Sequence, residues 1–352
     1  MSTEGGVKAV IAALLANLGI AIAKFFAWFM TGSSSMLSEA IHSLADSANQ
    51  VLLLIGGARA KRAPDVGHQF GYGRRRYVYG FVVSIILFSV GGMFAVYEGS
   101  HKIAHPEELT DPQWAIGVLL VAMVLEGLSL RTAIREANHS RGSRSLFTFV
   151  RESRQPELPV VLLEDTGALI GLALALIGVV LSVVTGDAIW DGLGSMSIGV
   201  LLLMIAAFLA FEIASLLVGE SAIPEEQEHI RTALESAPGV NRVIHLRTLH
   251  VGPDDLLVAA KIAVDDDDSA QEIAMAIDNA EKRVRAVVPN ATYIYLEPDL
   301  DRYRPGEAPP EDVQDFAVPG SEDPDAETPD DTETPDAGEQ TSDDHQAKAE
   351  ER

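Results

Sequence analysis

An imidazole and two carboxylates lie at helical spacing inside an apolar segment early in the chain. Glu39, His42 and Asp46 occupy positions i, i+3 and i+7, so a helix would place them along one stripe. The segment continues into Val51–Ile55 and is long enough to cross a bilayer. Ionisable side chains at bilayer depth cost about 2.5 kcal/mol or more each, so they are typical of functional positions.

His42 and Asp46 are one helical turn apart, so both side chains can reach the same small cation. Imidazole nitrogen together with carboxylate oxygen suits a first-row divalent metal, and zinc is the first candidate. The alternative is structural: a buried His–Asp hydrogen bond that fixes helix packing. The high cost of intramembrane charge favours the metal-binding interpretation.

Further ionisable residues occur in later apolar segments. Glu164 and Asp165 are adjacent and point about 100° apart on a helix, so we expect one to bind metal and the other to support it or lie near the rim. Glu126 has apolar neighbours on both sides, which is typical of a supporting group, a proton-path group or an ion-pair partner. Lys24 is expected to snorkel to the interface, and Asp191 to lie at the outer one.

The composition combines a hydrophobic chain with a large negative charge. Of 352 residues, 47% are hydrophobic, yet the formal net charge is −25. Six segments of about 20 residues or more are apolar enough to span, which predicts a polytopic α-helical membrane protein with six transmembrane helices. These segments are Val7–Met30, Ser34–Ala58, Tyr77–Glu98, Pro112–Thr132, Pro159–Val184 and Ile189–Val218.

Basic residues concentrate in two of the predicted loops. Residues 59–76 and 131–154 hold six arginines or lysines each, whereas the three loops on the opposite side hold only Lys102. By the positive-inside rule, both termini and both basic loops are cytoplasmic, in a multi-pass protein of the cell membrane. Cysteine is absent, so any metal is left to His, Asp and Glu.

The pattern changes after the last apolar segment. The order helix, strand, strand, helix, strand predicts a small α+β (α-β-β-α-β, ferredoxin-like) cytoplasmic domain. The second helix opens with the capping box Ser269–Glu272, and the last strand is bounded by Pro298. The predicted elements are a helix from Pro224, strands Val243–Val251 and Leu256–Val264, a helix to Val287 and the strand Ala291–Leu296.

From Asp301 onward there are 18 acidic residues against 4 basic ones, with few large apolar side chains. This composition predicts an acidic disordered tail. We therefore expect three regions: a transmembrane domain over residues 1–219, a cytoplasmic dimerisation domain over residues 220–300 and the tail over residues 301–352.

Enzyme motifs are missing from the sequence. There is no nucleotide-binding loop, nucleophile elbow or His-Glu-x-x-His helix, and the Gly-rich stretch Phe70–Arg76 lacks a strand-loop-helix setting. The chain is therefore not expected to be an enzyme. A secondary transporter, a channel and a membrane receptor remain.

With these features, the chain resembles the cation diffusion facilitator family, most of all the branch that contains human zinc transporter nine. The resemblance covers Val7 to Pro298 and rests on the His42-x-x-x-Asp46 pair, the loop Pro64–Gly73 and a small α+β domain after the last span. The segments that look most like that branch are Ser38–Asp46, Val150–Gly167, Trp190–Ser195 and Leu217–Ser221.

The resemblance implies a homodimer in a lipid bilayer that exchanges zinc or a related divalent ion for protons. The family's usual site joins two ligands of span two to a His-x-x-x-Asp pair of span five. Here Asp165 matches that Asp, but Val161 stands where the His would be. The implied ligands are His42, Asp46 and Asp165, with Glu164 or water as the fourth. Loss of an imidazole favours harder ions, so manganese, iron and cobalt stay open beside zinc.

The family's soluble domain often binds zinc through histidines on its second and third strands. At those positions this chain has Lys261 and Tyr295, followed by Glu297, so we expect dimerisation rather than metal binding there. No prosthetic group and no nucleic-acid partner are expected.

The predicted function is a zinc-type divalent metal/proton antiporter that exports metal from the cytoplasm. The alternative is a non-transporting membrane receptor or scaffold with a vestigial metal site.

Overall fold

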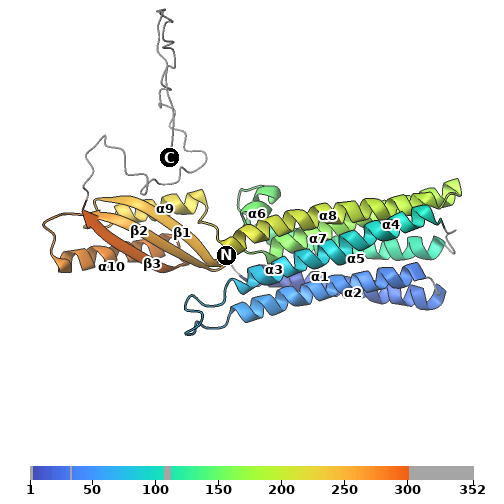
Figure 1. Ribbon diagram of the computed structural model, residues 1–352, viewed down its shortest axis with the longest axis horizontal. Helices are drawn as coiled ribbons and strands as arrows, with labels where there is room; N and C mark the ends of the chain where they lie inside the picture. Colours follow the sequence, from blue (N-terminus) through green and yellow to red (C-terminus); the bar gives the residue numbers. More distant parts are fainter. Residues whose placement is uncertain (1–2, 32–33, 107–111, 301–352) are drawn as a thin grey trace, which may run out of the picture. The chain divides into compact units, whose positions relative to one another are not determined.

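The computed structural model describes residues 3–31, 34–106 and 112–300 (Figure 1). Its N-terminal part is helical. Long helices run side by side, and the small helix α6 lies between α5 and α7 in the chain. The helices are α1 (Thr3–Thr31), α2 (Ser34–Ala60), α3 (Arg75–Ile86), η1 (Leu87–Met93), α4 (Phe94–Ala104), α5 (Pro112–Ser140), α6 (Leu146–Glu152), α7 (Glu157–Thr185) and α8 (Ile189–Val218).

Five helical segments of the described chain are long and apolar enough to cross a membrane. The predicted second span, α2, packs against α1 and α3 but is not among them. Asp46, Asn49 and Gln50 interrupt its apolar sequence and lower its hydropathy. The sequence predicted six spans, whereas the described residues support five by length and composition. The five are Val7–Phe26, Arg75–Ala104, Pro112–Ser140, Glu157–Thr185 and Ile189–Val218.

The segment Arg75–Ala104 is a single spanning unit made of three helical pieces. Its centre, η1, is a π-helical turn that contains Gly91 and Gly92. A Cβ added at Gly92 would lie 2.6 Å from Cδ2 of Leu203 in α8. The widened turn and the missing side chain therefore let η1 lie directly against α8.

Glycines also bring α8 against its other neighbours. A Cβ at Gly199 would lie 2.5 Å from the backbone nitrogen of Val96, and one at Gly178 would lie 2.9 Å from the carbonyl oxygen of Trp190. Small residues at helix contacts are typical of membrane bundles, where close backbone approach replaces the hydrophobic effect as the source of packing energy. The bundle therefore holds α4, α7 and α8 at near-contact distance.

The C-terminal part of the described chain has the predicted order α9, β1, β2, α10, β3. The sheet order is β1-β2-β3, with β1 and β2 antiparallel and β2 and β3 parallel, which needs the crossover that α10 provides. Ile230, Leu256 and Ile262 are fully buried in its core. The elements are α9 (Pro224–Glu235), β1 (Arg242–Gly252), β2 (Asp255–Val264), α10 (Ala270–Val287) and β3 (Ala291–Leu300).

Two local predictions about this domain have different outcomes. The capping box is confirmed, because the Ser269 side chain accepts from the Glu272 backbone and the Glu272 carboxylate accepts from the Ser269 backbone. The end of the last strand was predicted wrongly. β3 continues through Pro298, which lies opposite Ile262, to Leu300. β3 is at the edge of the sheet, where a proline costs no ladder hydrogen bond. The predicted tail, residues 301–352, lies outside the described residues.

Candidate metal centre

The two predicted site residues of span five are buried side by side in α7. Glu164 exposes 6% of its surface and Asp165 exposes 1%. Two amides of α2 hold the Glu164 carboxylate: Gln50 Nε2 donates to Oε2 at 2.6 Å and Asn49 Nδ2 donates to Oε1 at 3.4 Å. Both oxygens of Glu164 are therefore occupied by hydrogen bonds that tie α7 to α2.

Asp165 has a different environment. Ser129 of α5 donates to Asp165 Oδ2 at 2.6 Å, and this bond orients the carboxylate. Its other oxygen, Oδ1, is buried and has no hydrogen-bond partner among the described residues. A buried polar atom without a partner needs an explanation, and a role in binding a cation would supply one. Of the adjacent pair, Asp165 is thus the residue with an oxygen left to bind a metal.

Asp46 of α2 belongs to the same region. It is half-buried and close enough to Glu164 and Asp165 for their charges to interact. The structure therefore brings the predicted residues Asp46, Glu164 and Asp165 together. The backbone of His42 is in α2, one turn before Asp46, but its side chain lies outside the described part of the structure.

Three carboxylates in a buried region repel one another and lose hydration, so a cation or protons must compensate them. Among the described side chains, which do not include His42, no group of three or more His, Asp or Glu is arranged to hold a metal ion. The predicted imidazole, His42, lies in the part that is not described, so the predicted cation site stays a prediction.

Two further charged residues face this interior. Glu126 of α5 is buried, and its charge interacts with those of Asp165, Asp46 and Lys24. Lys24 exposes only 5% of its surface and donates to Ser43 Oγ at 3.0 Å. The prediction that Lys24 snorkels to the interface was wrong, since a polar partner inside the bundle holds its ammonium group.

Sequence reasoning did not single out Asn49, Gln50 or Ser129. A signal was present. Asn49 and Gln50 follow Asp46 by three and four residues, and Ser129 follows Glu126 by three. Residues at these spacings share a helix face, so the polar stripes of α2 and α5 could have been extended by one turn each.

Arg76 connects the start of α7 to the cytoplasmic domain. Its buried guanidinium binds Glu157 through two nitrogens, with Nη2 at 2.8 Å from Glu157 Oε2. Nη1 donates to Asp254 Oδ2, in the turn between β1 and β2, at 2.8 Å. Glu157 begins the helix that also contains Glu164 and Asp165. The Arg76 side chain therefore connects α3 to the start of α7 and to the turn between β1 and β2.

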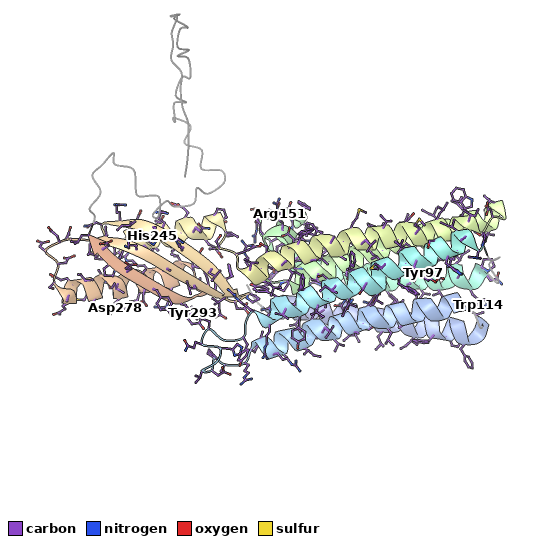
Figure 2. The ribbon with its side chains drawn as sticks, viewed as in Figure 1. Tyr97, Trp114, Arg151, His245, Asp278 and Tyr293 are labelled. Carbon is purple, nitrogen blue, oxygen red and sulfur yellow. The ribbon has the colours of Figure 1, made fainter. Side chains whose placement is uncertain are left out.

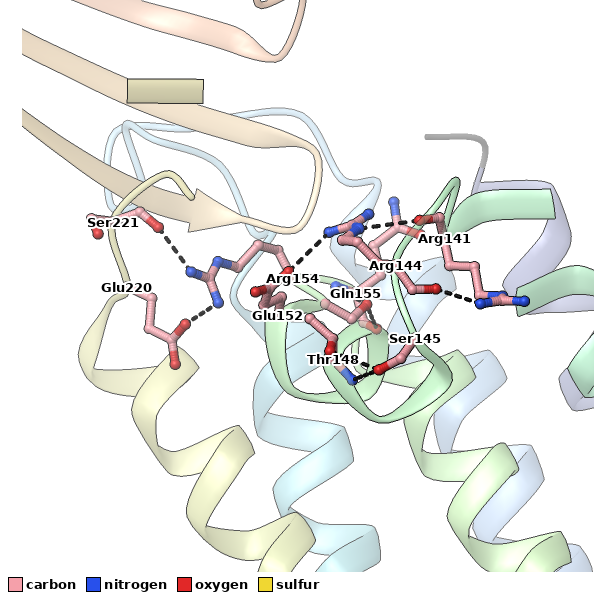
Figure 3. Close-up of polar contacts among 10 residues, drawn as sticks. Arg141, Arg144, Ser145, Thr148, Glu152, Arg154, Gln155, Glu220 and Ser221 are labelled. Carbon is pink, nitrogen blue, oxygen red and sulfur yellow. Dashed lines mark hydrogen bonds and ion pairs between the residues drawn. The ribbon is translucent and has the colours of Figure 1, made fainter. Parts of the chain in front are cut away.

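A second arginine makes a parallel connection, shown in Figure 3. Arg154 forms an ion pair with Glu220 and donates to the carbonyl oxygen of Ser221 at 3.2 Å. The backbone of His250 in β1 in turn donates to the carbonyl oxygen of Glu220 at 2.8 Å. The loop before α7 is thus tied to the link between α8 and α9.

The sheet surface carries an ion-paired cluster around Lys261. Lys261 of β2 lies 3.0 Å from an Asp299 oxygen and 3.2 Å from a Glu297 oxygen, both on β3. His245 lies opposite Lys261 on β1 and is labelled in Figure 2. The two carboxylates already have an ammonium partner, which argues against a divalent ion at this position.

Comparisons with known proteins show which family the chain resembles. The family model described as the cation efflux transmembrane domain matches residues 10–218, and the one described as the cytoplasmic domain of cation efflux proteins matches residues 223–299. The proton-coupled zinc antiporter SLC30A9, mitochondrial, of Homo sapiens is 34% identical over 264 residues, which cover 74% of this chain and 46% of the relative.

More distant relatives match as well. Metal tolerance protein C4 of Arabidopsis thaliana is 28% identical over 72% of this chain and 56% of its own length. The cation-efflux pump FieF of Pectobacterium atrosepticum is 25% identical over 81% of this chain and 90% of its own. The chain spans about half the length of the SLC30A9 relatives that it matches.

The contacts of Arg76, Arg154 and His250 form a junction between the helical bundle and the sheet. Within this junction, His250 makes the free energy of unfolding depend on pH. Burial, and next the charge of Arg154, lower the pKa of His250 from 6.5 to about 4. Between these values the unfolded chain binds a proton that the folded chain does not, so the free energy of unfolding falls as the pH falls. The loss between pH 7 and pH 4 is at most about 3 kcal/mol.

Denaturant unfolding of the full chain in detergent at pH 7.5 and 5.5 would measure this effect. His250→Gln should make the cytoplasmic domain less sensitive to pH over this interval. The exposed His229 of α9 offers a matched control, since His229→Gln should leave the dependence unchanged. Equal pH dependence in wild type and His250→Gln would contradict the assignment.

Proposed function

The chain belongs to the cation efflux family of membrane transporters, and from this membership we propose that it exchanges zinc, or a related divalent cation, for protons. The proposed direction is export from the cytoplasm, across the cell membrane. The proposed division is a transmembrane domain over residues 1–219, with α2 as the sixth spanning helix, a dimerisation domain over residues 220–300 and an acidic tail.

The observation that carries this proposal is the convergence of Asp46, Glu164 and Asp165 from α2 and α7, with one Asp165 oxygen that has no hydrogen-bond partner in the described part of the chain. We assign His42, Asp46 and Asp165 as the ligands of the transported ion, with water as the fourth. Both oxygens of Glu164 accept from amides of α2, so its role is to add negative charge beside the ion and to hold α7 against α2.

Proton exchange follows from the same arrangement. Buried carboxylates must be compensated by a cation or by protons, and a ligand that has bound a proton cannot bind a metal. Metal and protons therefore occupy the site alternately. His42 would make this competition effective near neutral pH, because an ordinary imidazole titrates close to pH 6.5. The name of the SLC30A9 relatives states the same coupling for those proteins.

The first test is flux through the site variants. Asp46→Ala and Asp165→Asn should each abolish zinc uptake into proteoliposomes with an imposed pH gradient, because three protein ligands leave none to spare. His42→Asp should keep some flux, shift the preference toward manganese and weaken the dependence on pH. Glu164→Gln should be milder than Asp165→Asn.

Asp187→Asn is the matched control, since Asp187 is an exposed carboxylate in the connection between α7 and α8. It should transport like the wild type. If the ligand variants also transport like the wild type, the transporter proposal fails and a receptor or scaffold role takes its place. If Glu164 is essential and Asp165 is dispensable, the ligand assignment in α7 is wrong.

The proposed orientation predicts which residues are reached from outside. The chain has no cysteine, so single cysteines report cleanly. Thr185→Cys should react with an impermeant maleimide in intact cells, whereas Ser143→Cys should react only after permeabilisation. Both positions are exposed. Labelling of Ser143→Cys in intact cells would invert the topology.

The proposed homodimer should not need metal in its cytoplasmic domain, because Lys261 already forms ion pairs with both Glu297 and Asp299. The full chain in detergent should keep the mass of a dimer after prolonged chelation, as measured by light scattering. A shift to monomer on chelation, reversed by zinc, would show instead that this domain depends on a bound ion.

A further inference from the structure

Two imidazoles lie at the end of the spanning segment Arg75–Ala104 that is opposite to its arginines. His101 is in the last turn of α4 and His105 follows as its C-cap. Their rings are stacked, with centroids 4.8 Å apart and an angle of 28° between the planes. Both side chains are exposed. Tyr97, labelled in Figure 2, lies one turn earlier, 6.3 Å from the His101 ring.

This spacing suits a first-row divalent metal. Two histidines four residues apart share one helix face, and metals such as zinc bind imidazole nitrogen at about 2.0–2.1 Å. Both exposed rings can turn about their side-chain bonds, so an ion can enter between them with modest adjustment. The carbonyl ends of the helix also favour a positive charge at this position.

The neighbouring cation does not block such an ion. Lys102 lies between the two histidines in sequence, but its Nζ pairs with Asp191 of α8 at 3.0 Å. The ammonium charge is therefore compensated by a carboxylate of another helix. Glu98 precedes His101 by three residues, yet no third His, Asp or Glu in the described part of the chain completes a cluster. Water would supply the remaining ligands.

We propose that His101 and His105 form a two-imidazole site for a first-row divalent cation at the non-cytoplasmic end of the bundle. With two protein ligands, this site binds more weakly than the buried site with three. It holds an ion that has left the buried ligands and then gives it up to solvent. This role rests on the proposed function, whereas binding itself does not.

Binding can be measured without transport. The probe is Zn²⁺, titrated calorimetrically into the full chain in nanodiscs at pH 7.5, in an Asp46→Ala/Asp165→Ala background that removes the buried site. His101→Ala and His105→Ala should each weaken one class of zinc site by about tenfold or more, because one imidazole cannot chelate. His139→Ala is the matched control, since His139 is an exposed histidine in the last turn of α5.

Cu²⁺ provides a second reading of the same pair. The electron paramagnetic resonance spectrum of one bound Cu²⁺ should show coupling to two imidazole nitrogens, and to fewer in either alanine variant. Zinc binding that is unchanged in both variants, or that is lost in only one of them, would overturn the proposal. Failure of the flux tests with retained binding by the pair would reject the proposed function and leave this site standing.

Discussion

The need to compensate buried negative charge governs the membrane part of this protein. Asp46, Glu164 and Asp165 meet inside the helical bundle, where each carboxylate would be unstable alone. The bundle meets this need in two ways. Amide and hydroxyl donors from α2 and α5 satisfy three of the four oxygens of the adjacent pair, and the fourth has no hydrogen-bond partner within the described ranges. That difference is why Asp165 is the proposed ligand and Glu164 the proposed supporting carboxylate.

The same helix that holds these carboxylates begins at the cytoplasmic junction. Glu157 opens α7 and binds the guanidinium of Arg76, which also binds Asp254 in a turn of the cytoplasmic sheet. Arg154, three residues before Glu157, makes the second connection, to Glu220. A displacement of α7 along its axis would therefore have to move the sheet, break the buried, doubly bonded pair of Arg76 and Glu157, or break the single contact of Arg76 with Asp254.

Much of this arrangement could be predicted from the sequence, and what could not has physical reasons. The length of the apolar segments and the helical spacing of their polar residues predicted that Asp46 lies in α2 and that Glu164 and Asp165 lie in α7. Residues typical of turns predicted the order of the helices and strands after α8. The partners Gln50 and Ser129 were missed, because an uncharged polar residue in a helix gives no sign of which neighbour it faces. Lys24 was misplaced for the same reason, since its depth depends on Ser43 of another helix.

The burial of the ion pairs between the bundle and the sheet determines how strongly salt weakens them. The side chains of Arg76 and Glu157 expose only 8% and 9% of their surface, so dissolved ions have little access to this ion pair, whereas Asp254 exposes 47%. Screening acts over about 8 Å at physiological ionic strength, but mainly on charges that the solvent reaches. The ion pair that holds the start of α7 is therefore largely independent of salt, while its extension to the sheet through Asp254 and the exposed basic side chains of the neighbouring loops are subject to it.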